Sequence, residues 1–193
     1  GAGGGALLGG IIGKIAGNTA VGAAIGGAVG AGTGAIIGRH MDKVAAETAS
    51  QVENAKVEEV TDANGLKAVK VTFDSGILFN LNQASLNNTS KNELAKFSKV
   101  LKKNADCHVD IYGYTDRSGN DAINVPLSQK RAQSVADYLS ACGVSRSQLQ
   151  NVEGRGSQDE IENKRVSHVN RRVEVYLYAS KAMVDAAESG RLN

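Results

Sequence analysis

The sequence predicts an α+β fold in which helices pack on one face of a mixed sheet, preceded by an α-helical glycine-zipper hairpin. Short β-branched runs after residue 65 alternate between apolar and polar residues, which is the period of strands. Between them, apolar residues recur three or four apart, which is the period of helices. The first 38 residues differ from both because glycine and alanine dominate them. A chain of 193 residues allows one domain and an appendage.

The elements of the predicted domain, residues 66–180, follow the order β-α-β-α-β-β. The predicted strands cover residues 66–73, 107–114, 148–154 and 171–179, and the predicted helices cover residues 90–103, 128–142 and 180–190. Ser128 is a suitable N-cap for the second helix, which ends at Cys142-Gly143. Such an order places the helices on one face of the sheet. Residues 181–193 are expected to form a C-terminal helix and tail.

Glycines recur every four residues through the block 1–38, interrupted at Asn18-Thr19. Residues four apart share one face of a helix, so each run forms a groove into which another helix fits. We therefore predict a helical hairpin with its turn at Asn18-Thr19. Residues 20–38 would span about 28 Å as a helix, near the thickness of a bilayer core. A flexible Gly/Ala tract is the alternative, and membrane insertion is left open.

Residues 39–65 are predicted to form a connecting helix and linker. Val44, Thr48, Val52 and Ala55 recur at helical spacing among many charged residues, which indicates a solvated helix over 39–60. Residues 62–65, Asp-Ala-Asn-Gly, then supply a turn.

Composition argues against several classes of function. A formal net charge of +2 is too small for a nucleic-acid partner. The three histidines are scattered and no paired carboxylates or metal-ligand spacings occur, so we expect neither an enzyme, a metal site nor a cofactor. Cys107 and Cys142 both fall on inward-facing positions, and either a disulfide or two free thiols would fit.

A polar segment over residues 113–132 separates a predicted strand from the next helix. Asp116 follows the strand, Arg131 lies near the start of the helix, and Asn124 adds hydrogen-bonding groups between them. Asp accepts from an ammonium and Arg binds a carboxylate in bidentate fashion, so the pair suits a small ligand that bears both charges. A plain Asp116–Arg131 salt bridge that fixes the loop is the alternative.

The segment GYTDRSGNDAINVPLSQKRAQSVADYLSACGV resembles the signature of OmpA-like C-terminal domains, and the resemblance extends through VEGRGSQDE to the closing NRRVEVYL. This resemblance implies non-covalent binding of peptidoglycan through the diaminopimelate of the stem peptide. Two positions match the charged ligand-binding residues, Asp116 and Arg131. The further positions that it implies are Thr115, Asn124 and Leu127, with Phe79 and Asn80 as pocket walls, and Asn170 and Arg171, which either border the site or hold the sheet. Departures from the family pattern are Pro126, expected in the loop, and residues 156–170, expected away from the pocket.

The glycine block followed by such a domain is similar to outer-membrane lipoproteins of the YiaD kind. That resemblance implies a lipid-modified cysteine upstream of Gly1 and a place on the periplasmic face of the outer membrane of a Gram-negative bacterium. The implied partners are diaminopimelate-type peptidoglycan and the outer membrane. The implied function is a tether between the two. The alternative is a membrane oligomer or pore, driven by the zipper and positioned by the wall-binding domain.

Overall fold

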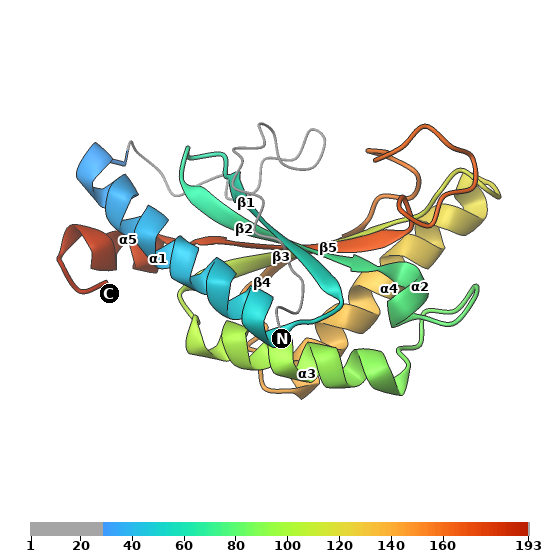
Figure 1. Cartoon of the computed structure of the whole chain (residues 1–193), viewed down its shortest axis with the longest axis horizontal. Helices are drawn as coiled ribbons and strands as arrows, with labels where there is room; N and C mark the ends of the chain where they lie inside the picture. Colours follow the sequence, from blue (N-terminus) through green and yellow to red (C-terminus); the bar gives the residue numbers. More distant parts are fainter. Residues whose placement is uncertain (1–28, 193) are drawn as a thin grey trace.

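The computed structural model describes residues 29–192 and contains one five-stranded sheet with its helices (Figure 1). The strands are β1 (Ala55–Thr61), β2 (Lys67–Asp74), β3 (Cys107–Tyr114), β4 (Leu149–Gly154) and β5 (Arg172–Ala179). The helices are α1 (Ala31–Gln51), α2 (Ser75–Leu78), α3 (Asn88–Lys103), α4 (Asp121–Ala141) and α5 (Lys181–Glu188).

The sheet is mixed, with strand order β1-β2-β5-β3-β4. Only β3 and β4 pair in parallel, and α4 forms the crossover between them. The remaining neighbours, β1–β2, β2–β5 and β5–β3, are antiparallel. The predicted α+β class and mixed sheet are therefore confirmed.

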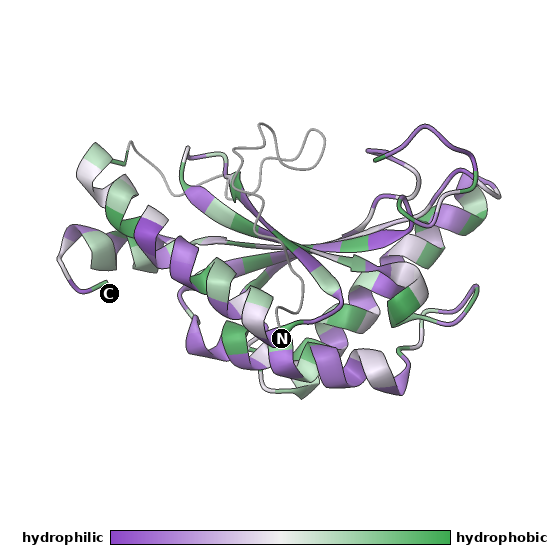
Figure 2. Cartoon of the chain, viewed as in Figure 1, coloured by the Kyte–Doolittle hydropathy of each residue, from purple (hydrophilic) through white to green (hydrophobic). Residues whose placement is uncertain are grey.

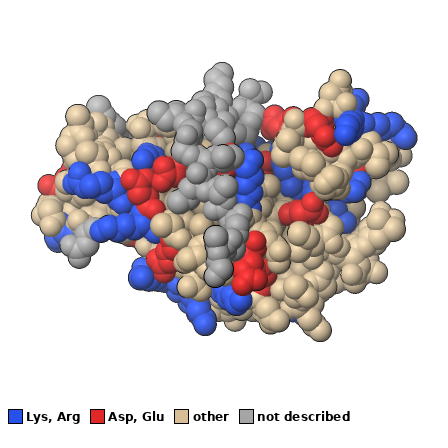
Figure 3. Space-filling model, in the orientation of Figure 1, with Lys and Arg blue, Asp and Glu red and all other residues tan. Residues whose placement is uncertain are grey.

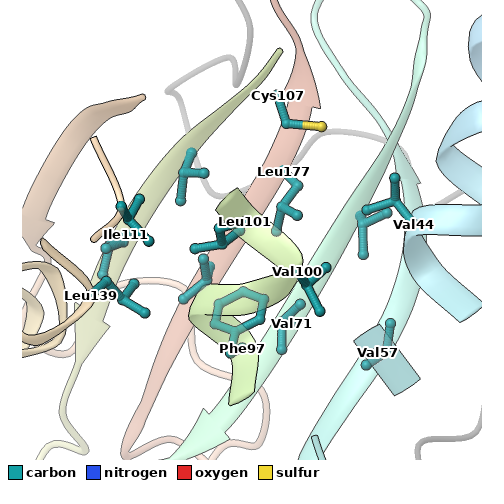
Figure 4. Packing of buried hydrophobic residues seen from close by; sticks show 14 of the residues in the cluster. Val44, Val57, Val71, Phe97, Val100, Leu101, Cys107, Ile111, Leu139 and Leu177 are labelled. Atoms are coloured by element: carbon teal, nitrogen blue, oxygen red, sulfur yellow. The ribbon is translucent and has the colours of Figure 1, made fainter. Parts of the chain in front are cut away.

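The main core lies between the helices and one face of this sheet. Apolar positions alternate along each strand, so Val71, Ile111 and Leu177 point to the same side and meet Phe97 of α3 and Leu139 of α4 (Figure 4). Helices α1 and α3 mix polar and apolar residues along their length, as surface helices do (Figure 2). Burial of this apolar face is the main favourable contribution to the stability of the fold.

The other face of the sheet holds a second buried cluster, in which tyrosine rings contact arginine side chains. Tyr112, Tyr114, Tyr176 and Tyr178 are buried there with Val60 and Ala68, and no described helix contributes a residue to the cluster. The guanidinium groups of Arg155 and Arg172 lie 3.7 and 4.0 Å from the ring centroids of Tyr112 and Tyr114. These contacts stack a cation on an aromatic face.

Two glycines allow α4 to approach the sheet closely. A Cβ atom on Gly113 of β3 would lie 2.3 Å from the carbonyl oxygen of Ser128, and one on Gly154 of β4 would lie 2.2 Å from the backbone nitrogen of Gln129. Both distances are far below contact, so only glycine fits. This close packing holds α4, at Ser128 and Gln129, against the carboxyl ends of β3 and β4.

The predicted solvated helix over residues 39–60 is wrong in its second half and in its exposure. Helix α1 ends at Gln51, and residues 55–61 form strand β1, which pairs with β2 at the edge of the sheet. Met41 and Val44 of α1 are buried against the sheet. The alternation of β1 is difficult to recognise in the sequence because the adjacent residues Glu58 and Glu59 are both charged. They lie on opposite faces of the strand, and each forms an ion pair with a lysine.

The predicted start of the second long helix is also wrong. Helix α4 begins at Asp121, where the side chain of Asn120 accepts a hydrogen bond from the Ile123 nitrogen at 3.1 Å. Ser128 therefore lies inside the helix, and so does Pro126, which was expected in the loop. Proline fixes a backbone φ near the helical value, so it is compatible with the helix at the cost of one hydrogen bond.

Most of the predicted zipper hairpin lies outside the described residues. Within them, Ala31–Gly38 are helical as part of α1, which continues over the sheet. No helix in residues 29–192 is long and apolar enough to cross a membrane. Cys107 is buried, Cys142 is partly exposed at the end of α4, and both are free thiols, so the disulfide alternative is not what the structure contains.

Candidate functional site

A pocket of about 620 Å³ opens at one end of the sheet. Its walls come from α2 and the segment after it, the end of β3, the start of α4 and the residue before β5. Figure 1 shows α2, the start of α4 and the turns before β5 gathered at this end. Segments far apart in the sequence therefore meet around one cavity, which is the usual setting of a binding site.

Asp116 supplies the negative charge of the pocket. Its Oδ2 accepts from the Ser167 nitrogen at 3.0 Å and from Nη1 of Arg171 at 2.5 Å, and its Oδ1 accepts from the backbone and hydroxyl of Ser118. Burial alone would raise the pKa of Asp116, but the hydrogen bonds from Ser118, Ser167 and Arg171 outweigh it and lower this pKa below its ordinary value. The carboxylate is thus charged and rigidly held.

The loop that carries Asp116 is closed by Asn124. The amide nitrogen of Asn124 donates to the carbonyl oxygens of Asp116 at 3.4 Å and Ser118 at 3.2 Å. Gly119, next to this amide, has a φ of +86°, a conformation that favours glycine. Asn124 therefore fixes the loop that carries Asp116 and so helps to shape the pocket.

Arg131 supplies a positive charge from the end of the third turn of α4. Its guanidinium lies 5.1 Å from the ring centroid of Phe79, and its Nε donates to the carbonyl oxygen of Gln83 at 3.0 Å. The two terminal nitrogens make no hydrogen bond to any residue in 29–192, although the residue is only 6% exposed. Burial, and then the neighbouring charge of Arg171, lower the pKa of Arg131, but arginine remains charged.

Two hydroxyl groups in the pocket wall also lack partners. Ser75 Oγ and Thr115 Oγ1 are buried and make no hydrogen bond within the part of the chain that the structure describes. An unpaired buried hydroxyl is costly, so groups of this kind at a pocket commonly bond to a ligand or water. The pocket thus offers unused donors beside a charged carboxylate.

Eight of the nine predicted site residues line this pocket. They are Phe79, Asn80, Thr115, Asp116, Asn124, Leu127, Arg131 and Arg171. Asn170 does not line it, because its side chain accepts from the nitrogens of Ile161 and Glu162 and so holds the turn before β5. Of the two roles left open for this pair, Arg171 therefore borders the pocket and Asn170 holds the turn before β5.

Several lining residues were not predicted. They are Ser75, Gly76, Leu81, Asn82, Ser118, Gly119 and Ile123. Leu81 is 87% and Ile123 60% exposed, so each places an apolar side chain on the rim. Exposure of large apolar residues depends on the fold, and the only signal in the sequence was their position in otherwise polar segments.

Two sequence-based expectations about the surroundings of Asp116 are wrong. The ion pair of Asp116 is with Arg171, and none joins it to Arg131, so a plain Asp116–Arg131 salt bridge does not account for the two residues. Residues 156–170 do not lie away from the pocket, because the Ser167 nitrogen is one of the donors to Asp116. Both contacts join segments about fifty residues apart, a distance that spacing alone does not resolve.

Other chemistry has no comparable constellation in the described part of the chain. No group of three or more His, Cys, Asp or Glu in residues 29–192 could hold a metal ion. Lys and Arg are mixed with Asp and Glu over the face shown in Figure 3. The pocket around Asp116 and Arg131 is therefore the candidate site.

Comparison with protein families gives two matches that together cover most of the chain. The model of the OmpA family matches residues 78–174, and a model described as a glycine zipper matches residues 1–45. The first match contains most of the pocket, including Asp116 and Arg131.

Curated relatives are similar over the same region. The chain is 38% identical over 111 residues to the peptidoglycan-binding protein ArfA of Mycobacterium bovis, covering 56% of this chain and 34% of that protein. It is 33% identical over 124 residues to outer membrane protein A of Shigella flexneri, covering 63% of this chain and 35% of the relative. The matched region thus spans about a third of the length of these relatives.

Solved structures share the fold. The cell wall anchor of the type VI secretion system from Pseudomonas aeruginosa matches with a TM-score of 0.58 at 25% identity, over 72% of this chain and 97% of that chain. A MotB-like protein from Desulfovibrio vulgaris matches with a TM-score of 0.61 at 19% identity, over 77% and 96%. The second likeness shows the fold alone.

Proposed function

Because the chain belongs to the OmpA family, we propose that it binds peptidoglycan non-covalently and tethers the outer membrane to the cell wall. The ligand in this proposal is the free end of the diaminopimelate residue of a stem peptide, which carries an ammonium and a carboxylate on one carbon. The relative ArfA is named as a peptidoglycan-binding protein, which supports this choice of polymer.

The observation that supports the proposal most is the state of Arg131. A buried guanidinium with two unused terminal nitrogens, lining an open pocket, presents the two parallel donors that a carboxylate accepts. The Phe79 ring lies 5.1 Å from the group and stabilises its charge by a cation–π contact. A ligand carboxylate there would form a bidentate pair at little conformational cost, because the side chain is already ordered.

The ammonium of the ligand is assigned to Asp116. Its carboxylate accepts from four donor groups, and the Arg171 guanidinium is the one that belongs to a partly exposed side chain, 36% exposed. The ligand ammonium joins or replaces Arg171 at Oδ2, and the released guanidinium is then free to reach the ligand carboxylate. Thr115 and Ser75 supply hydroxyl groups for the remaining polar atoms of the ligand.

This arrangement implies selectivity and reversible attachment. Lysine, the other common third residue of stem peptides, lacks the carboxylate that Arg131 would bind, so we expect weaker binding of the lysine type of wall. One site of this size gives modest affinity, and repeated stem peptides along the polymer add avidity where several copies are held on one membrane. We propose a binding role and no catalytic one.

Co-sedimentation with isolated diaminopimelate-type sacculi tests the proposal. Wild-type protein is expected to pellet with the sacculi, and Asp116→Ala and Arg131→Ala are expected to stay in solution. Arg146→Ala is the matched control, because it removes an exposed arginine whose partner, Asp137, lies outside the pocket. If wild type and all three variants partition alike, the proposal is wrong.

A second candidate function rests on the glycines of the N-terminal block. The zipper match covers residues 1–45, and among residues 29–192 no atom outside the neighbouring turns of α1 lies within 4 Å of the position that a Cβ on Gly38 would take. An open glycine on a helix suits close packing by another helix, so a zipper-driven oligomer is the alternative. Light scattering of the full chain separates the two, because a simple tether is monomeric and the alternative gives a larger mass.

A further inference from the structure

A second pocket, of about 410 Å³, lies on the opposite face of the sheet. Its floor includes Lys56 and Glu58 of β1 and Lys70 and Thr72 of β2. These positions alternate with core residues such as Val57 and Val71, so their side chains point away from the main core. None of the family expectations above includes these residues.

The second pocket adjoins the first along the chain. Asp74 and Arg172 line the second pocket, whereas the next residues toward the end of the sheet, Ser75 and Arg171, line the first. The Ser75 nitrogen donates to the Arg171 carbonyl oxygen at 3.0 Å, which joins the two segments into one ridge. Gly76, on this ridge, is exposed. The two pockets thus lie on either side of a narrow boundary at the same end of the sheet.

Charges around the second pocket cancel in pairs. Lys56 lies 3.4 Å from Glu58, and both Lys70 and Arg172 reach Glu174, at 3.7 and 2.6 Å. The remaining carboxylate, Asp74, accepts from the Gly76 nitrogen at 2.7 Å. With Glu174 included, three cations face three anions, so neither a strongly anionic nor a strongly cationic ligand is favoured.

The lining instead combines hydrogen-bonding groups with an apolar wall. Thr72, Asn54 and His168 add hydrogen-bonding groups, and Ile161 and Val169 add the apolar part. The Ile161 side chain is 53% exposed, so it is available for contact. Hydrogen-bond donors and acceptors beside a small apolar patch match an N-acetylated sugar, which has hydroxyls, an amide and a methyl group but no net charge.

We infer that this second pocket binds an N-acetylated sugar of the glycan strand while the first pocket holds the stem peptide of the same strand. The inference rests on the proposed function. A stem peptide joins its sugar two residues before diaminopimelate, and three extended residues span about 10 Å. In this inference one peptidoglycan repeat crosses the ridge at Gly76 and occupies both pockets.

Titration calorimetry with two soluble ligands tests the inference. One is the free tripeptide ending in diaminopimelate, and the other is the same tripeptide attached to its N-acetylated disaccharide. Wild type is expected to bind the disaccharide-peptide about tenfold more tightly than the free peptide. Thr72→Arg, which fills the pocket, and Ile161→Ser, which removes its exposed apolar wall, are expected to bring the two dissociation constants together without changing that of the free peptide.

Thr61→Arg is the matched control, because Thr61 is a half-buried strand threonine outside this pocket. It should keep the tenfold difference, and circular dichroism should show that all variants are folded. Equal dissociation constants for the two ligands in wild type would overturn the inference while leaving the proposed function intact. So would a difference that survives both pocket variants. If neither ligand binds wild type, the proposed function fails and the inference fails with it.

Discussion

Asp116 and Arg171, 55 residues apart in the sequence, form an ion pair of 2.5 Å in the wall of the candidate site. Asp116 is buried, whereas the Arg171 side chain is 36% exposed. The pair therefore joins a buried carboxylate to a guanidinium on a partly exposed side chain. In the proposed function this guanidinium occupies the position that the ligand ammonium takes on binding.

Arg171→Ala should raise the pKa of Asp116 toward its ordinary value, because it removes one of the groups that lower this pKa. Carbon-detected NMR titration of the side-chain carboxyls measures the change directly. The Ser118 and Ser167 hydrogen bonds remain in this variant and should keep the shift incomplete. An unchanged Asp116 pKa would show that the ion pair is absent in solution.

The pH dependence of stability follows from the same carboxyl. Because the pKa of Asp116 is lower in the folded protein than in the unfolded chain, its stabilising contribution is present at neutral pH and is lost as pH falls below about 4. Asp116→Asn should therefore be less stable than wild type at pH 7, and the difference should shrink on acidification. Urea unfolding of both proteins at pH 7 and pH 3 checks this, and a difference that does not depend on pH would contradict it.

Ser75→Ala and Thr115→Val should weaken binding of the diaminopimelate peptide without lowering stability. Each removes a buried hydroxyl that has no partner within residues 29–192, so unfolding free energy should stay level or rise. Loss of one hydrogen bond to the ligand corresponds to about 0.5–1.5 kcal/mol, which is roughly 2- to 12-fold in dissociation constant. Calorimetry with the peptide measures the first effect and urea unfolding the second. Unchanged binding in both variants would show that these hydroxyls do not contact the ligand.

Gly113→Ala should destabilise the protein by about 1–3 kcal/mol, because the new methyl group would overlap the Ser128 carbonyl oxygen and push α4 from the sheet. Gly38→Ala is the control, since no described residue beyond the adjacent turns of α1 lies within 4 Å of its Cβ position and alanine favours a helix by about 1 kcal/mol. In thermal unfolding, Gly113→Ala should thus have a lower Tm than wild type and Gly38→Ala a higher one. Equal effects would contradict the close packing of α4.

Asp62→Asn should stabilise the protein at neutral pH. The carboxyl is buried in the β1–β2 turn, where its Oδ1 accepts from the Asn64 and Leu66 nitrogens, and burial raises its pKa to about 6. A folded-state pKa above the unfolded value costs stability above pH 6, and the cost fades as pH falls toward 4.

The expected gain for Asp62→Asn is about 1–3 kcal/mol at pH 7.5 and near zero at pH 4, measured by urea unfolding. Asp185→Asn, on the exposed side of α5, should change stability by no more than a few tenths of a kcal/mol. A gain that persists at pH 4 would show that the Asp62 carboxylate is not the source.

Local patterns in the sequence predicted four of the five strands and the helices α3 and α5 well. Residues 107–114 were predicted as a strand from alternation alone, and β3 covers Cys107–Tyr114. The predicted helix over 90–103 corresponds to α3, which begins two residues earlier at the Asn87 cap. These elements have one apolar face and one polar face, which is the information that periodicity contains.

Errors arose where partners distant in the sequence decide the structure. Strand β1 carries three charged residues in seven and was not recognisable without its neighbour β2, whose Lys67 forms an ion pair with Glu59. The close approach of α4 to the sheet depends on Gly113 and Gly154, which face Ser128 and Gln129 inside the helix. Asp116 was placed in the site correctly, but its bonding to Arg171 and Ser167 depends on the path of the chain before β5.

The most direct test of the account compares two stem peptides that differ only in the third residue, diaminopimelate or lysine. Calorimetry is made with wild type, Arg131→Ala and the exposed control Arg146→Ala. Wild type and Arg146→Ala are predicted to prefer the diaminopimelate peptide by about tenfold or more, and Arg131→Ala is predicted to lose that preference. Equal affinity of wild type for both peptides, or a preference that survives in Arg131→Ala, would contradict the assignment of the ligand carboxylate to Arg131.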